Sequence, residues 1–430
     1  MASPLQSRIV ALQMLQDILR DHKAMDQCLS TNRYFAKLSA EDRGFVRLLL
    51  ATVLRHLGEI DAVWQGFMDK KLPKKAYTAA DILRLGIAQL LFLKTPAHAA
   101  IHTSVELAKH KKLDGLKNLI NAVLRRAQSE GEVKLAELNA ITLNTPDWLY
   151  DSWANIYGND VATAIAAAHA VEPGLDISVK SDPEKWAERL GAAILPNGSL
   201  RLKVGGRVDA KDGFGAGEWW VQDVAATIPA RLLGKVAGKT VIDLCAAPGG
   251  KTAQLASTGA NVIAVDQSQA RIKRLEQNLR RLNLSAGIVC ADAASWQPPE
   301  KVSHILLDSP CSATGTIRRH PDIPYLKTKD DINRLSELQL KILLNATQML
   351  APGGILVYAV CSLQDEEGPQ IMAKALKQNP QLRRLPITAA DLPEFADLIN
   401  PQGDVRTLPC DLGDMGGMDG FYVCRLQLGA

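Results

Sequence analysis

The chain has 430 residues, of which 47% are hydrophobic and 22% charged, and its formal net charge is +4. This composition is typical of a globular protein, and the length predicts two or three domains. No apolar run approaches the roughly 18 residues that a membrane span needs, and the polar residues interleaved through "MASPLQSRIVALQMLQDILR" argue against a signal peptide. The seven cysteines form no CxxC pair, so we expect a cytoplasmic protein without disulfides or a metal site.

Residues 1–140 carry apolar side chains at helical spacing. In "SRIVALQMLQDILR", Ile9, Leu12, Leu15 and Leu19 lie on one stripe, and "LKNLINAVLRRAQ" repeats the pattern. The segments "DRGFVRLLLATVLRHLGEIDAVWQGFM" and "TAADILRLGIAQLLFL" predict further helices between them. We therefore expect an all-helical domain over residues 1–140.

The same residues carry most of the excess positive charge. Residues 1–140 contain 21 Lys and Arg against 14 Asp and Glu, whereas the remainder contains 29 against 32. A basic excess indicates either a polyanionic partner such as RNA or simply a solvated helical surface. Lys109, Lys111 and Lys112 in "KHKK" are the candidate RNA contacts, and a solvated turn is the alternative for them.

The pattern changes between residues 141 and 215. "TPDWLYDSWANIYG" predicts a helix, and "LDISVK" at residues 175–180 predicts a short strand. We therefore expect a small α/β connector subdomain over residues 141–215.

From residue 216 onward, short apolar strands alternate with amphipathic helices. The strand candidates are "KTVIDLCA", "NVIAVDQ", "GIVCADA", "HILLDSP" and "GILVYAVCS", and helical segments such as "QARIKRLEQNLRRLN" separate them. This alternation predicts a parallel sheet that is covered on both faces. We expect a Rossmann-like α/β domain over residues 216–430, with ligands bound beyond the carboxyl ends of its strands.

The first of these strands leads into a glycine turn. In "VIDLCAAPGGKTAQLA", Gly249 and Gly250 allow the backbone to approach a ligand closely at the N-terminus of a helix. The GxGxxG dinucleotide fingerprint and the GxxxxGK(S/T) phosphate loop are both missing from this segment. The turn therefore favours a cofactor without nucleotide phosphates.

Acidic residues end the next two strands. Asp266 in "AVDQ" is suited to accept both hydroxyls of a ribose, and capping of the following helix is its alternative role. Asp292 in "VCADA" can accept a hydrogen bond from an exocyclic amine such as that of adenine. A ribose and an adenine without a pyrophosphate describe S-adenosylmethionine, which we expect as the cofactor.

The fourth and fifth strands each lead into a cysteine. Cys311 follows Asp308 in "LLDSPCSATG", and Cys361 lies in "VCS". One such cysteine is most often apolar packing, with metal ligation and nucleophilic attack as alternatives. Two thiols beside a methyl donor favour methylation of carbon-5 of a pyrimidine, in which a thiolate first adds to carbon-6. Asp308 would bind the N3 edge of that ring.

Four segments resemble the RNA cytosine-C5 methyltransferases: "LCAAPGGKT", "LDSPCSATGTIRRHPD", "VCSLQDEE" and "GMDGFYVCRL". The helical block resembles the fold of the NusB antitermination factor. Together they are similar, over nearly the whole chain, to the bacterial 16S ribosomal RNA methyltransferase B family of the Fmu/Sun type. The resemblance implies that Cys361 is the nucleophile and that Cys311 helps to release the methylated RNA. It also implies cofactor binding by Cys245, Ala246, Ala247, Pro248, Gly249, Gly250, Lys251, Asp266, Asp292 and Asp308, with Lys251 a further catalytic candidate.

The sequence departs from the family pattern at two places. Val360 stands where the family usually has Thr before the nucleophile, and "LDISVK" lacks the Arg and Asn common in the corresponding strand. Arg318 and Arg319 keep a basic step after the fourth strand, and we expect them to bind RNA phosphates, with ion pairs to nearby acids as the alternative. The flipped base is expected between the fourth and fifth strand ends.

The expected function is therefore methylation of a cytosine in 16S ribosomal RNA by a monomer without an obligate protein partner. The same chemistry on transfer RNA or 23S RNA is an alternative. A non-catalytic RNA-binding module and a DNA cytosine methyltransferase, in which the thiol after the proline would attack, are alternatives of other classes. The intact Asp308, Cys311 and Cys361 favour the enzyme.

Overall fold

The computed structural model describes residues 4–203 and 205–429, which divide into two compact units. The first unit reaches to Val171 and also includes Ile317–Lys327, and the second comprises Glu172–Thr316 and the chain from Thr328 onward. None of the helices in the described ranges is both long enough and apolar enough to cross a membrane.

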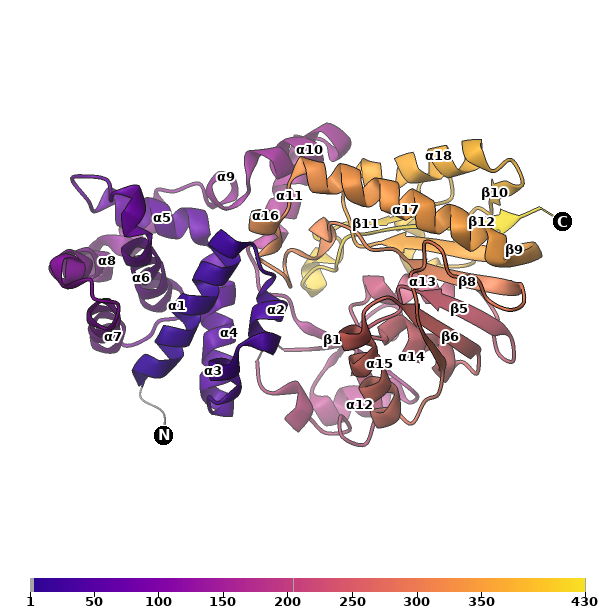
Figure 1. The fold of residues 1–430 in the computed structure, drawn as a ribbon, viewed down its shortest axis with the longest axis horizontal. Helices are drawn as coiled ribbons and strands as arrows, with labels where there is room; N and C mark the ends of the chain where they lie inside the picture. The colour runs from indigo at the N-terminus through magenta and orange to yellow at the C-terminus, as the bar shows by residue number, and fades with distance from the viewer. Residues whose placement is uncertain (1–3, 204, 430) are drawn as a thin grey trace. The chain divides into compact units, whose positions relative to one another are not determined.

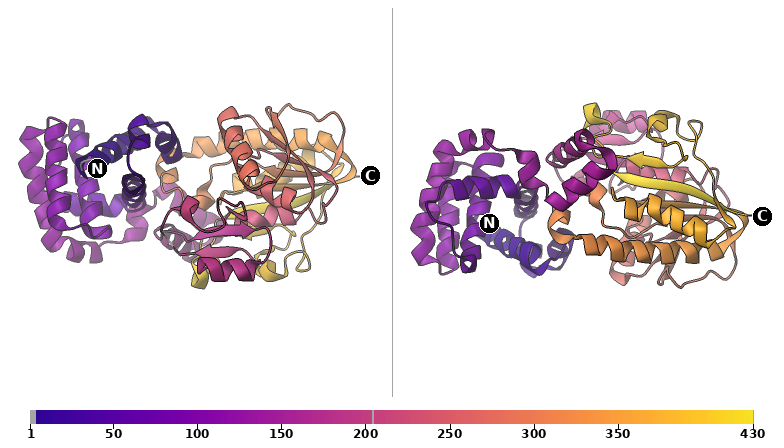
Figure 2. Two further views of the ribbon diagram at one scale, coloured as in Figure 1. Left: turned by 90° about the horizontal axis from the view of Figure 1, so that it is seen from below. Right: turned by 90° about the horizontal axis from the view of Figure 1, so that it is seen from above.

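The first unit is built from helices, as its apolar stripes predict (Figures 1 and 2). Leu12 and Leu15 are fully buried in its core, where they join Leu49 and Val53. Ile9 and Leu19 pack against the edge of that core. The helices are α1 (Pro4–Asp21), α2 (Met25–Thr31), α3 (Arg33–Ala36), α4 (Ala40–Arg55), α5 (Leu57–Gly66), α6 (Tyr77–Ile87), α7 (Ala97–His110), α8 (Lys117–Ala136), α9 (Ala140–Asn144), α10 (Asp147–Tyr157), α11 (Asn159–His169) and α16 (Ile323–Leu326).

The helical unit extends beyond the predicted boundary at residue 140 because α9 packs on α5. Asn144 Nδ2 donates to Glu59 Oε2 at 2.6 Å, and the Glu59 amide donates to Asn144 Oδ1 at 3.1 Å. A Cβ atom at Gly58 would lie 1.8 Å from the carbonyl oxygen of Leu143, so the two backbones touch. Residues 141–171 therefore belong with the helices and not with an α/β connector.

The segment Ile317–Lys327, which we call the crossover segment, also folds as part of the helical unit. Asp322 Oδ2 accepts a hydrogen bond from the Met25 amide at 2.8 Å, and Tyr325 donates its hydroxyl to the Leu54 carbonyl at 2.9 Å. Burial raises the pKa of Tyr325, so its hydroxyl keeps the proton that it donates. These contacts hold the crossover segment in the helical unit, although in the sequence it follows the strand that ends at Asp308.

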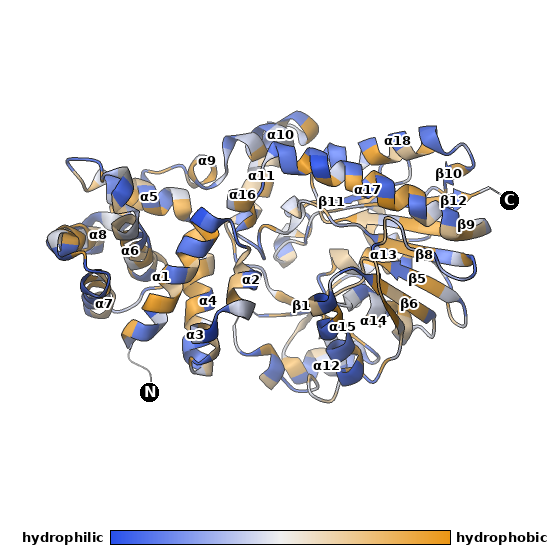
Figure 3. Cartoon of the chain, in the orientation of Figure 1, coloured by the Kyte–Doolittle hydropathy of each residue, from blue (hydrophilic) through white to orange (hydrophobic). Residues whose placement is uncertain are grey.

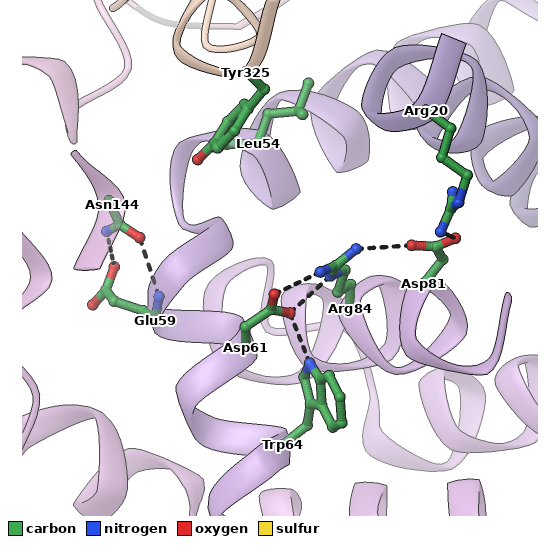
Figure 4. Close-up of polar contacts among 9 residues, drawn as sticks. All are labelled: Arg20, Leu54, Glu59, Asp61, Trp64, Asp81, Arg84, Asn144 and Tyr325. Atoms are coloured by element: carbon green, nitrogen blue, oxygen red, sulfur yellow. Dashed lines mark hydrogen bonds and ion pairs between the residues drawn. The ribbon is translucent and has the colours of Figure 1, made fainter. Parts of the chain in front are cut away.

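A chain of partly buried polar contacts crosses the same unit (Figure 4). Arg84 lies between two carboxylates, with Nη2 2.6 Å from Asp61 Oδ2 and Nη1 2.9 Å from Asp81 Oδ1. Arg20 Nη2 reaches the other oxygen of Asp81 at 2.5 Å, and Trp64 Nε1 donates to Asp61 Oδ1 at 2.7 Å. Two guanidinium groups thus compensate the fully buried Asp81 and the half-buried Asp61, which is the condition under which such charges are tolerated inside a protein.

The second unit begins with a small antiparallel sheet in the order β2-β3-β1-β4. The strands are β1 (Leu175–Val179), β2 (Ala193–Ile194), β3 (Leu200–Leu202) and β4 (Trp219–Val221), and α12 (Pro183–Leu190) follows β1. Arg201 forms a buried, two-pronged ion pair with Asp176, at 2.6 and 2.7 Å, and donates to the carbonyl oxygens of Met415 and Gly417 at 2.7 Å. This arginine ties the small sheet to the C-terminal part of the same unit.

The large sheet has the order β10-β12-β9-β8-β5-β6-β7, with β11 beside β12. Strands β5 to β9 pair with one another in parallel, as the alternating pattern predicts. Strand β12 runs antiparallel to β9. The strands are β5 (Thr240–Leu244), β6 (Asn261–Asp266), β7 (Gly287–Cys290), β8 (Val302–Asp308), β9 (Leu350–Val360), β10 (Leu382–Arg384), β11 (Val405–Thr407) and β12 (Phe421–Leu428).

Helices cover both faces of this sheet (Figure 1). Helices α17 (Lys329–Met349) and α18 (Pro369–Gln378) pack on the face that carries Ile242 and Tyr358. Helices α13 (Ile228–Arg231), α14 (Gly250–Ser257) and α15 (Gln269–Arg281) pack on the other face. The strands are mainly hydrophobic and α15 mainly hydrophilic (Figure 3), as expected when a sheet is buried on both sides and its helices meet solvent.

Candidate active site

The two cysteines predicted at neighbouring strand ends lie side by side. Strand β8 pairs with β9 in parallel, with Asp308 opposite Ala359, so the loops that follow both strands leave the same edge of the sheet. The Sγ atoms of Cys311 and Cys361 are 3.4 Å apart. Val360, the departure from the family pattern, is fully buried in the core at the end of β9.

The surroundings of Cys311 keep it protonated. The hydrogen bond to Cys361 is the largest effect that raises the pKa of Cys311 well above its usual value, followed by burial and by the charges of Cys361 and Glu367. Cys311 therefore keeps its proton 3.4 Å from the Cys361 sulfur, and either thiol can donate the hydrogen bond between them. The pair thus places a thiol that retains its proton in contact with a second sulfur.

Lys251 and Asp308 form an ion pair at the same edge. Lys251 Nζ lies 2.8 Å from Asp308 Oδ2 and 5.1 Å from the centre of the Phe421 ring. Burial acts to lower the pKa of Lys251, but the charges of Asp308, Cys361 and Asp243 and the hydrogen bond to Asp308 outweigh it, so the pKa is raised. The ammonium group therefore remains charged within the electrostatic reach of Cys361.

The glycine turn after β5 has the backbone geometry that its sequence predicts. Gly249 has a φ of 102°, a left-handed conformation that favours glycine, and an added Cβ there would lie 3.0 Å from Cγ of Leu275. Cys245 also has a positive φ, of 61°, and burial raises the pKa of its thiol, so it is an unreactive packing residue. Ala246 and Ala247 are buried, and Pro248 leads into the turn.

Asp266 ends β6 and Asp292 follows the end of β7, as predicted. Asp266 is buried, and its two oxygens accept from the amides of Ser268 at 2.9 Å and Ala247 at 3.1 Å. Ser268, and not Asp266, is the N-cap of α15. Asp292 is exposed, and its Oδ1 accepts from the Ala294 amide at 2.9 Å.

Asp243, which was not predicted from the sequence, interacts electrostatically with Asp308, Lys251 and Asp266. It lies on β5, is fully buried, and accepts a hydrogen bond from Thr252 at 2.6 Å. Burial raises its pKa to about 7, against the opposing effect of that hydrogen bond. An acid in the middle of the apolar segment "VIDLC" was the available signal.

The terminal "GMDGFYVCRL" segment supports the loop that carries Cys311. Gly420 donates its amide to the Gly315 carbonyl at 2.8 Å, and a Cβ atom at Gly315 would lie 2.0 Å from the Gly420 carbonyl oxygen. The Gly315 amide in turn donates to the Cys361 carbonyl at 3.0 Å. Close backbone contact explains why glycines stand at both positions.

The predicted RNA contacts lie in the helical unit. Lys109 is exposed at the end of α7, paired with Glu106 at 2.6 Å, and Lys111 and Lys112 form the turn that follows. Arg318 is only 2% exposed, and its carbonyl oxygen accepts from Arg55 at 2.8 Å. Arg319 is half-buried. The burial of Arg318 does not favour its predicted contact with phosphate, because its side chain is withdrawn from solvent.

Metal ligands do not gather anywhere in residues 4–203 and 205–429, where no group of three or more His, Cys, Asp or Glu side chains has an arrangement that could hold an ion.

The parallel core with an antiparallel β12 between β9 and β10 defines a Rossmann-like methyltransferase domain, preceded by a helical unit. A family model described as 16S rRNA methyltransferase RsmB/F matches residues 230–427, and a NusB family model matches residues 5–129. The chain belongs to the RsmB/F family of 16S rRNA methyltransferases. The expected fold class and family resemblance are confirmed.

Individual relatives match over most of their length. Ribosomal RNA small subunit methyltransferase B of Vibrio cholerae is 35% identical over 408 residues, which cover 91% of each chain. The protein of the same name from Pseudomonas putida is also 35% identical, over 97% of this chain and 98% of its own. The solved structure titled "Crystal Structure of PH0851" is similar in fold over 99% of both chains, with a TM-score of 0.76 at 22% identity.

Proposed function

We propose that this protein transfers a methyl group from S-adenosylmethionine to carbon-5 of a cytosine in 16S ribosomal RNA. The observation that carries this proposal is the pair of thiols 3.4 Å apart beside the Lys251–Asp308 ion pair. The names of the relatives, which are ribosomal RNA small subunit methyltransferases, support 16S RNA as the substrate.

The proposed chemistry assigns a separate task to each sulfur. Carbon-5 of cytosine is a poor nucleophile until the Cys361 thiolate bonds to carbon-6. After carbon-5 has been methylated, its proton leaves to a base, and the electrons of that C–H bond restore the ring double bond as Cys361 departs. Cys311 lies close enough to Cys361 to assist this departure.

Asp308 and Lys251 would bind the edge of the base. Among the described residues, Asp308 Oδ2 binds Lys251, whereas Oδ1 has no hydrogen-bond partner and is left as an acceptor. The Lys251 ammonium supplies a donor and a positive charge. An acceptor and a donor together match the exocyclic amine and ring nitrogen of cytosine, and the charge stabilises the adduct.

The strand-end residues fit S-adenosylmethionine. A Cβ atom at Gly250 would meet nothing within 4 Å, so the glycine turn borders open space. Asp292 is exposed and uses Oδ1 for the Ala294 amide, which leaves Oδ2 for an adenine amine. The amides of Ala247 and Ser268 hold the Asp266 carboxylate in place for ribose hydroxyls. The bound cofactor supplies an electrophilic methyl group.

The test combines product analysis with the two thiols. With labelled donor and 16S RNA, wild-type protein should produce 5-methylcytosine, and transfer RNA and 23S RNA should remain unmodified. Cys361→Ala should abolish transfer, whereas Cys311→Ala should accumulate a covalent RNA–protein adduct on a denaturing gel. Cys410→Ala, which changes a half-buried thiol outside the pair, should behave as wild type. The reverse outcome for the two thiols would overturn the assignment of roles.

A further inference from the structure

Glu367 is a buried acid between the two cysteine-bearing loops. It is the last residue of the short helix Asp365–Glu367 and is 0% exposed. No Lys, Arg or His of the described residues forms an ion pair with it. A buried carboxylate without a cation needs other donors to compensate its loss of hydration.

The donors to Glu367 come from the residues next to the two cysteines. Ser312, which follows Cys311, donates its amide to Oε1 at 2.8 Å and its hydroxyl to Oε2. Ser362, which follows Cys361, donates its hydroxyl to Oε2 at 2.5 Å. Gln339 of α17 donates to Oε1 at 2.9 Å. One carboxylate therefore joins the loop after β8, the loop after β9 and α17.

Further hydrogen bonds fix the position of Glu367 itself. Tyr358 donates its hydroxyl to the Glu367 carbonyl at 2.7 Å. Gln339 Nε2 also reaches the Pro310 carbonyl at 2.9 Å, immediately before Cys311. Hydrogen bonds to a charged acceptor are roughly twice as strong as neutral ones, so the carboxylate holds this arrangement more firmly than an amide would.

We propose that Glu367 is a positioning residue, which fixes the spacing of Cys311 and Cys361 by binding the residue that follows each of them. The effect of Glu367 on catalysis rests on the proposed function. Its effect on the distance between the two thiols does not depend on which reaction the protein catalyses. In the sequence Glu367 appears as the last letter of "VCSLQDEE", with nothing in its spacing that marks it as different from Glu366.

The charge of Glu367 also acts on Cys311. The titratable groups that act on Cys311, or on which Cys311 acts, are Cys361, Glu367 and Tyr358. Tyr358 is neutral, because burial raises its pKa well above the usual value. The Glu367 carboxylate is one of the charges that raise the pKa of Cys311. Its removal should make Cys311 lose its proton at lower pH.

Two substitutions distinguish the effect of the charge of Glu367 from the effect of the length of its side chain. Glu367→Gln keeps the shape and removes the charge, and Glu367→Asp keeps the charge and withdraws it by one methylene group. Both should lower kcat by about 100-fold, the usual cost of a misplacement of about 1 Å, with KM for RNA unchanged. Because Cys311 has to hold its proton to assist the departure of Cys361, activity should fall at the pH where Cys311 loses that proton, and in Glu367→Gln alone this fall should move to lower pH. Glu366→Gln, on the same short helix and partly exposed, is the matched control and should behave as wild type.

Cross-linking of the thiols measures their spacing without methyl transfer. Diamide takes one hydrogen from each thiol as the S–S bond forms, and its N=N bond is reduced to a hydrazine. Cys311–Cys361 disulfide formation, followed by peptide mass, should be about tenfold slower in Glu367→Gln than in wild type or Glu366→Gln. If Glu367→Gln fails to fold, Ser312→Ala and Ser362→Ala each remove donors to the carboxylate and should show smaller effects in the same direction.

The outcomes distinguish this inference from the proposed function. If wild-type protein does not methylate cytosine, the proposed function fails, while the cross-linking rates still test the role of Glu367. If Glu367→Gln matches wild type within twofold in both cross-linking and turnover, the positioning role is overturned. A loss of thermal stability with unchanged cross-linking and an unchanged pH profile would assign Glu367 a purely structural role and would also overturn the inference.

Discussion

At the scale of single residues, Asp243 shows how burial makes a carboxyl group sensitive to pH near neutrality. Thr252 donates to its Oδ2, whereas its Oδ1 has no hydrogen-bond partner among the residues that the structure describes. A carboxylate that is short of donors and removed from water is costly, so the neutral form is favoured. The pKa of this group is accordingly raised from 3.8 to about 7.

This pKa predicts that stability decreases as pH rises. Between pH 4 and 7 the unfolded chain has lost the Asp243 proton and the folded chain still holds it, so a rise in pH favours unfolding. The contribution is fully present below pH 4 and is lost by about pH 7. The free energy of unfolding contributed by Asp243 should therefore fall by about 3 kcal/mol between pH 5 and pH 8.

Asp243→Asn removes this titration and keeps an acceptor for Thr252. The stability of the wild-type α/β unit relative to this variant should therefore be about 3 kcal/mol lower at pH 8 than at pH 5. Urea unfolding of both proteins at the two pH values measures this difference in free energy of unfolding. The contributions of other titrating groups cancel because both proteins contain them. A difference that does not change with pH would contradict the prediction.

At the scale of elements, the contact between Gly315 and Gly420 joins the Cys311 loop to the start of β12. The Gly420 carbonyl occupies the space that a side chain at Gly315 would need. Backbone cannot move aside as a flexible side chain can, so a methyl group there must separate the two segments. The loop and the strand therefore form one structural element, although about a hundred residues separate them in the sequence.

Gly315→Ala should destabilise the α/β unit by about 2–3 kcal/mol, as overpacked positions usually do, and should lower activity because the Cys311 loop moves. Gly413→Ala is the control, since this glycine is exposed and an added Cβ would meet nothing within 4 Å. The control should change stability by less than about 1 kcal/mol. Equal effects of the two substitutions on the unfolding midpoint would show that the close contact has no energetic consequence.

Local pattern was sufficient for much of this unit and insufficient for its long-range contacts. The apolar segments predict the parallel strands, and the adjacency of β8 and β9 predicts that Cys311 and Cys361 meet. The contact of Gly315 with Gly420 and the role of Glu367 depend on which loops the fold brings together, and no local period carries that information. The same limit applies to α9, whose attachment to α5 depends on backbone contact at Gly58.

At the scale of the whole molecule, the helical unit is made from two separate parts of the chain. Asp322 in the crossover segment accepts from the Met25 amide. Asp322→Ala should therefore lower the stability of the helical unit by about 1–3 kcal/mol, the cost of leaving a buried donor unsatisfied. Hydrogen exchange at the Met25 amide and its neighbours should accelerate, while exchange in β5 and β8 should not change.

Asp330→Ala provides the comparison, because Asp330 is an exposed acid shortly after the crossover segment. It should leave exchange in the helical unit unchanged. Uniform acceleration throughout both units in Asp322→Ala would show instead that the two units unfold together.

The crossover segment has a consequence for the order of events during synthesis. Helices α1 to α11 leave the ribosome before Glu172–Thr316 has been made, and at about 5–20 residues per second that stretch takes on the order of 10–30 s. Throughout this interval Asp322 and Tyr325 have not been synthesised. The Met25 amide and the Leu54 carbonyl therefore cannot form the hydrogen bonds that they make in the complete protein. The last step in completing the N-terminal unit is thus set by translation of the crossover segment, which follows the strand and loop that carry Cys311.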